Sequence, residues 1–141
     1  MRVNLRAIAQ AANEDPTAAL WASAGPLTDY EIFHNFVLVA TYVPPEKIGS
    51  IIVPDVSMME SRFQGKVGLV LKCGPMAFVD DAVARFGGVV VEPGDWVMYR
   101  PSDGLELFIK DHAGLANDGL SCRLIEDTLI KGRVRDPALI Y

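Results

Sequence analysis

The 141-residue chain has little cysteine, no long apolar run and no excess of positive charge. Its two cysteines, Cys73 and Cys122, lie far apart and form no Cys-x-x-Cys pair, which favours two reduced, buried thiols. No uncharged apolar stretch approaches the roughly 18 residues that cross a bilayer, and the run from Ala7 to Ala12 is too short for a signal peptide. Thirteen Lys and Arg against 18 Asp and Glu give a net charge of −5, which argues against non-specific nucleic-acid binding. We therefore expect a cytoplasmic protein with no nucleic-acid and no membrane partner.

The sequence also lacks any pattern typical of a catalytic or metal site. His34 and His112 have no His, Cys or carboxylate partner at metal-ligand spacing. Residues 111–118 are loosely acidic but lack the alternating oxygen ligands of a calcium loop. No Lys-Ser or Lys-Thr follows Gly87-Gly88, so that pair is not part of a phosphate-binding loop. We expect no catalytic residue, no metal, no cofactor and no enzymatic activity.

What the chain has is a series of short apolar, β-branched segments between turn signals. Half of the residues are hydrophobic and 22% are charged, which suits one packed domain. The turn at 102–104 predicts that the segments on either side of it form a hairpin. The pattern as a whole predicts an all-β fold, a small barrel or sandwich. The expected strands are 36–43, 66–72, 95–100, 105–110, 122–126 and 128–134.

Three segments depart from this strand pattern. Residues 1–33 form an alanine-rich N-terminal arm, in which Asp15, Pro16 and Gly25-Pro26 predict the start and the end of a short helix. Within residues 76–87, apolar residues recur at helical spacing and predict a second short helix. Residues 135–141 form a short C-terminal tail.

The long connection from residue 44 to 65 contains three consecutive large aliphatics, Ile51, Ile52 and Val53, between a glycine and a proline. One interpretation is an edge strand that covers one end of the barrel. The other is an exposed recognition segment, since loops of this length are uncommon inside compact domains and are often functional. Burial of each side chain yields about 1.5–3 kcal/mol, but ordering the loop cancels much of that gain. A single loop would therefore bind weakly, whereas a ring of loops would bind well through avidity.

Five segments, in order along the chain, resemble the GroES-like co-chaperonin family. Residues 49–53, Gly-Ser-Ile-Ile-Val, are similar to the Gly-Gly-Ile-Val-Leu segment of the family's mobile loop. Residues 91–99, Val-Glu-Pro-Gly-Asp-Trp-Val-Met-Tyr, resemble its Val-x-x-Gly-Asp-x-Val-x-Phe signature. The opening strand at 34–39, the returning strand at 64–74 and the closing strands at 124–131 are also similar. The resemblance covers residues 34–134.

The resemblance implies a GroES-like β-barrel over 34–134, with a mobile loop at 44–65 and a roof insertion at 75–90. It also implies a homo-oligomer, a heptameric ring whose neighbouring subunits meet through their first and last strands. The interface residues on those strands would be Val37, Val39, Leu129 and Ile130. The partner would be a GroEL-like chaperonin, whose apical domains would bind Ile51, Ile52 and Val53, so that the ring caps the ATP-bound chaperonin and assists protein folding.

The arm, the helix at the roof position and the tail depart from the family pattern. Such elaborations are common in viral relatives of this fold, so a bacteriophage-encoded protein in the host cytoplasm is one interpretation. The alternative is a virion structural or capsid-decorating protein, with a phage capsid protein as its partner and residues 1–32 clasping its neighbours. A fragment of an alcohol-dehydrogenase-type enzyme contains a related barrel, but this chain lacks a nucleotide-binding half and a zinc ligand cluster.

Overall fold

The computed structural model describes residues 16–42, 66–114 and 119–140. Within this part of the chain a single α-helix, α2 (Pro16–Ala24), precedes six strands. Two 3-10 turns, η1 (Asp127–Leu129) and η2 (Pro137–Leu139), flank the last strand. The strands are β1 (Phe36–Thr41), β2 (Val67–Cys73), β3 (Trp96–Met98), β4 (Leu105–Ile109), β5 (Leu120–Glu126) and β6 (Gly132–Val134). In these described ranges no helix has the length and hydrophobicity that crossing a membrane requires.

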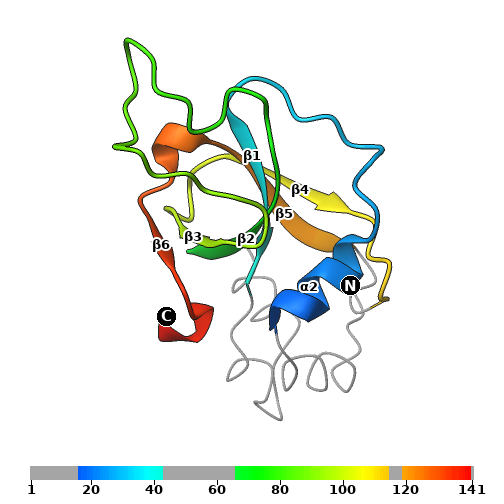
Figure 1. Cartoon of the computed structure of the whole chain (residues 1–141). Helices are drawn as coiled ribbons and strands as arrows, with labels where there is room; N and C mark the ends of the chain where they lie inside the picture. The colour runs from blue at the N-terminus through cyan, green and yellow to red at the C-terminus, as the bar shows by residue number, and fades with distance from the viewer. Residues whose placement is uncertain (1–15, 43–65, 115–118, 141) are drawn as a thin grey trace.

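The six strands form one antiparallel sheet in the order β4-β5-β1-β2-β3-β6 (Figure 1). β1 lies inside the sheet, paired with β5 along one edge and with β2 along the other. β4 and β6 are the outer strands of the described part, and the pairing found there does not join them to each other. The prediction of a β-rich fold is confirmed.

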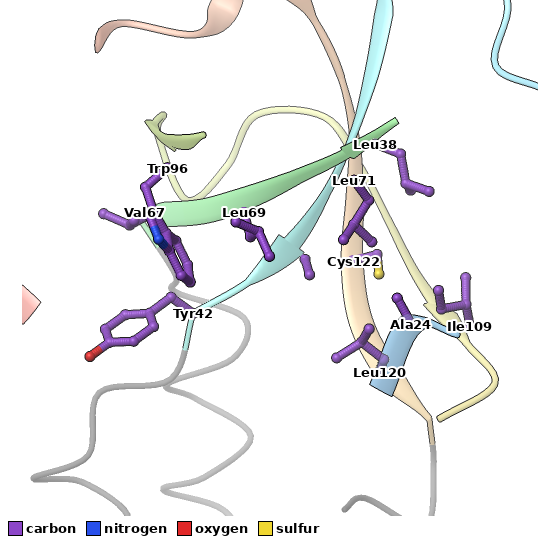
Figure 2. Close-up of a cluster of buried hydrophobic side chains, with 11 residues drawn as sticks. Ala24, Leu38, Tyr42, Val67, Leu69, Leu71, Trp96, Ile109, Leu120 and Cys122 are labelled. Atoms are coloured by element: carbon purple, nitrogen blue, oxygen red, sulfur yellow. The ribbon is translucent and has the colours of Figure 1, made fainter. Parts of the chain in front are cut away.

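Alternation along the strands separates two apolar clusters, one on each face of the sheet. On β1, Leu38 and Ala40 belong to the first cluster, whereas Val37 and Val39 belong to the second. The first cluster, part of which Figure 2 shows, is completed by side chains from α2, from the segment after it and from the tail residue Ile140. The second cluster is completed by residues 77 and 78 and by Leu129 and Ile130. The arm and the tail residue Ile140 therefore pack on one face of the sheet, through the first cluster.

The helix predicted in the arm is confirmed as α2, which lies against the first cluster with Ala24 fully buried. Gly25 ends the helix in the left-handed conformation, with φ of 63°, and its N–H donates to the carbonyl of Trp21. The indole N–H of Trp96 donates to the Thr17 hydroxyl at 3.2 Å. Lys72 donates to the carbonyls of Leu27 and Tyr30 and so holds the segment after the helix against the sheet.

The predicted helix over 76–87 is wrong, because this segment has a turn at each end, a bend at 82–83 and irregular backbone between them. The Asp81 carboxylate accepts hydrogen bonds from the N–H groups of Val83 and Ala84, both at 2.7 Å. The Asp80 carboxylate accepts one from Phe86, also at 2.7 Å. These side chains bind the backbone N–H groups that a helix would use, and Phe78 has φ of 60°, which no right-handed helix allows. The apolar spacing instead brings the rings of Phe78 and Phe86 into edge contact, with centroids 5.5 Å apart.

Two strand predictions also need correction. The segments on either side of the 102–104 turn do not form a hairpin: β3 pairs with β2 and β6, whereas β4 pairs with β5. Arg123 of β5 donates to the Asp103 carbonyl at 2.9 Å and so ties this turn to β5. The expected last strand over 128–134 is shorter than predicted, since η1 occupies 127–129 and pairing begins at Gly132.

Candidate functional site

The predicted recognition residues Ile51, Ile52 and Val53 lie outside the described residues, as does the rest of the 44–65 connection. The structure describes the two strands that this connection joins. β1 and β2 are antiparallel neighbours, and their pairing continues to the end of β1, where Thr41 lies opposite Gly68. The Tyr42 N–H then donates to the Val67 carbonyl at 3.0 Å. The connection therefore leaves and re-enters the sheet through adjacent, hydrogen-bonded positions.

Aromatic packing holds this end of the sheet in place. The rings of Tyr42 and Trp96 meet edge to face, with centroids 5.4 Å apart (Figure 2). Trp96 in turn bonds Thr17 of α2, and both aromatic side chains are buried. The positions from which residues 43–65 depart are thus braced by β3 and by the arm helix, which makes them a rigid base.

A group of buried polar side chains, which sequence reasoning missed, occupies the second face of the sheet near the same end. Thr41, Tyr99, Ser121 and Arg123 are each less than 5% exposed. The Ser121 and Thr41 hydroxyls lie 3.4 Å apart, and the Arg123 guanidinium carbon lies 5.9 Å from the centre of the Tyr99 ring. Burial raises the pKa of Tyr99 to about 12, although Arg123 and Thr41 act in the opposite direction. Strict alternation along β5 was the available signal, because it places Ser121 and Arg123 on one face.

The four predicted interface residues meet in the second apolar cluster. Val37 and Val39 of β1 are fully covered by their own chain. Leu129 at the end of η1 and the adjacent Ile130 are half-buried against the same cluster. Of the four, only Leu129 and Ile130 keep surface that a neighbouring subunit can contact, and the interface role stays a prediction.

The described cysteines are both free thiols. Burial raises the pKa of Cys122 to about 12, and burial together with the Asp95 carboxylate raises the pKa of Cys73. Both thiols are therefore protonated at neutral pH, the form that is a poor nucleophile and a poor metal ligand. Across residues 16–42, 66–114 and 119–140, no three His, Cys, Asp or Glu side chains are grouped so that they could hold a metal ion.

No known family matches the chain, and no curated protein matches its sequence.

Proposed function

We propose that this protein is a co-chaperonin lid built on a GroES-like β-barrel. In this proposal the sheet curls into the barrel, copies assemble into a heptameric ring, and each copy offers Ile51, Ile52 and Val53 to an apical domain of a GroEL-like chaperonin. The ring caps the ATP-bound chaperonin and encloses a folding chamber in the host cytoplasm.

The observation that carries the proposal is the way in which the apolar triad is attached to the fold. The triad lies near the middle of a segment whose two ends enter neighbouring strands, at Tyr42 and Val67, through a hydrogen bond of 3.0 Å. The strands that bear these ends are braced by Trp96 and α2. A recognition loop with a rigid base allows several copies in a ring to present their loops at matching positions, which multivalent capping requires.

Energetics favour many weak contacts over one strong contact. Burial of three large aliphatic side chains yields about 1.5–3 kcal/mol each, and ordering the loop and restricting its motion offset much of this gain. Each copy then binds weakly, and several tethered copies bind firmly. Modest affinity per copy also permits release of the lid when the chaperonin changes state.

The virion alternative assigned the arm to contacts with neighbouring molecules. In the structure α2 of that arm covers the first apolar cluster of its own chain, with Ala24 at 0% exposure. The described part of the arm therefore already has a role inside one copy, and we retain the lid as the proposed function.

A refolding assay tests the proposal. A chaperonin and ATP are supplied with an aggregation-prone substrate protein, and the yield of active substrate is measured with wild type, with Ile52→Asp and with Leu139→Asp. Leu139 is 71% exposed in η2, so this control adds the same charge to a surface apolar residue elsewhere. We expect wild type and the control to raise the yield and Ile52→Asp to lose the effect. Equal yields with and without wild-type protein would reject the lid function.

A further inference from the structure

Residues 74–91, here called the projection, carry an unusual amount of exposed apolar surface. They leave the sheet after β2 and return before β3, standing out beyond the strands at the top of Figure 1. Val83 is 95% exposed, and Met76, Val79, Val89 and Val90 are between 44% and 61% exposed. Phe33, which is 60% exposed, lies beside the base of the projection, since the carbonyl of the next residue accepts a hydrogen bond from the Met76 N–H at 2.9 Å. Several exposed large apolar side chains gathered on one short segment are typical of a protein interaction site.

Hydrogen bonds fix the base of the projection on both sides. The buried Asp127 carboxylate accepts hydrogen bonds from the Phe78 N–H at 2.9 Å and from the Asn35 amide at 2.8 Å. On the other side, Arg133 donates to the Val90 carbonyl at 3.0 Å and pairs with Asp95 at 3.1 Å. These contacts join the projection to η1, to the start of β1 and to β6.

The interior of the projection is ordered as well. Asp80 and Asp81 accept hydrogen bonds from three backbone N–H groups at 2.7 Å, and the Phe78 and Phe86 rings pack edge to face. The two non-glycine residues with positive φ in the described part of the chain, His34 and Phe78, both lie at its base. Backbone strain of this kind persists only where the surroundings enforce it. The backbone that carries the exposed side chains is thus ordered before any partner binds, which lowers the entropic cost of binding.

The charge on this end of the molecule restricts the kind of partner. Residues 26–36 and 74–92, which are hydrogen-bonded to each other, contain five carboxylates and one basic residue, Arg85. These carboxylates are Asp29, Glu31, Asp80, Asp81 and Glu92. Four charged side chains from outside the two segments are hydrogen-bonded to these segments, Lys72, Asp95, Asp127 and Arg133, and they add two charges of each sign. The excess of carboxylates over basic side chains at this end is therefore unchanged. A second copy of this surface, a nucleic acid or an anionic membrane would bring like charges together, which is unfavourable. A positively charged partner is favoured instead.

We propose that the projection, together with Phe33, binds a partner protein through a segment that combines large apolar and basic side chains. The apolar side chains of that segment pack on Val83, Val90 and their neighbours, and its Lys or Arg side chains face the surrounding carboxylates. This surface shares no residue with the Ile51–Val53 triad, and the inference does not depend on the lid function.

Selection from a random peptide library on the immobilised wild-type protein tests this inference, because it presumes no natural partner. We expect the enriched peptides to combine aliphatic or aromatic residues with Lys or Arg, and their affinity to fall as salt is raised. Fluorescence anisotropy then compares Val83→Asp and Val90→Asp with Leu139→Asp. We expect the first two variants to bind the selected peptides at least tenfold more weakly, and the control to bind as wild type does.

Three results would overturn the inference: no enrichment, enrichment of acidic or uncharged peptides, or equal binding by Val83→Asp and wild type. The substituted side chains are largely exposed, and circular dichroism checks that each variant is folded. Ile52→Asp separates the two proposals, because it should bind the peptides normally while failing as a lid. Val83→Asp should do the reverse.

Discussion

Tyr99 is a residue whose burial changes its ionisation in the folded protein. The residue is 4% exposed, and its backbone N–H donates to the Lys66 carbonyl at 3.0 Å. A phenolate there would lose its hydration, which is why burial raises the pKa of Tyr99 to about 12 despite the nearby Arg123 guanidinium. The folded state therefore favours the neutral phenol.

The raised pKa of Tyr99 makes the free energy of unfolding depend on pH. In the unfolded chain the tyrosine pKa is about 10, so the stability that Tyr99 contributes is complete below pH 10 and is lost as pH rises towards 12. We expect Tyr99→Phe to lie within about 1 kcal/mol of wild type at pH 7 and to show a shallower fall between pH 10 and 12. The difference in unfolding free energy should change by at most about 3 kcal/mol over that interval. Urea denaturation at several pH values measures it, and parallel curves for the two proteins would refute the explanation.

At the scale of elements, the docking of α2 depends on how its last turn meets the segment after β4. The His112 N–H donates to the Ser23 carbonyl at 2.9 Å, and a Cβ built on Gly25 would overlap the His112 ring. Gly87 has almost the same φ, 62° against 63°, but open space around the position of a Cβ. An alanine at Gly87 therefore introduces backbone strain alone, whereas an alanine at Gly25 introduces the same strain and an overlap with the His112 ring.

We expect Gly87→Ala to cost about 1 kcal/mol, the cost of a left-handed alanine, and Gly25→Ala to cost about 2–3 kcal/mol because the overlap adds to the strain. The double variant Gly25→Ala/His112→Ala should recover most of the additional stability that Gly25→Ala loses relative to Gly87→Ala, because the overlapping ring is gone. Chemical denaturation measures the free energy of unfolding of wild type and of the single and double variants. Equal losses at the two glycines would mean that α2 does not pack on His112 as described.

The elements that the sequence predicted well are those with local signals. Pro16 and Gly25 bound α2, and β-branched runs followed by Gly or Pro locate β1 and β2, all within a residue or two of the predicted positions. The errors arose where longer-range contacts decide the structure. At 76–87, carboxylates bonded to the backbone, together with the hydrogen bond to Asp127, override a helical pattern of apolar residues. The turn at 102–104 is local, but β4 finds its partner in β5.

The candidate site could be predicted only in part, for a similar reason. The triad Ile51–Val53 is visible as an apolar run inside a long connection, and the sheet explains how its ends are held. The buried position of Val37 and Val39 could not be read from their strand alone, because both sides of β1 are apolar and both faces of the sheet are covered. The exposed valines of the projection were hidden by the helical interpretation of that segment.

In the molecule as a whole, the arm, the sheet and the tail share the first apolar cluster. Leu20 and Trp21 of α2 and Ile140 of the tail pack on the first cluster. Removal of the arm would uncover this face of the sheet, so truncation cannot separate a lid from a virion component. The lid function and the virion function must therefore be distinguished by identifying the partner that the intact protein binds.

Native mass spectrometry of the intact protein mixed with a bacterial chaperonin and ATP is the most direct measurement. The lid function predicts a complex whose mass corresponds to the chaperonin plus seven copies of the chain, formed with nucleotide and absent without it. Ile52→Asp should abolish the complex, and Leu139→Asp should leave it intact. A wild-type protein that forms no complex where an established lid binds, or an Ile52→Asp variant that binds as wild type does, would contradict the account.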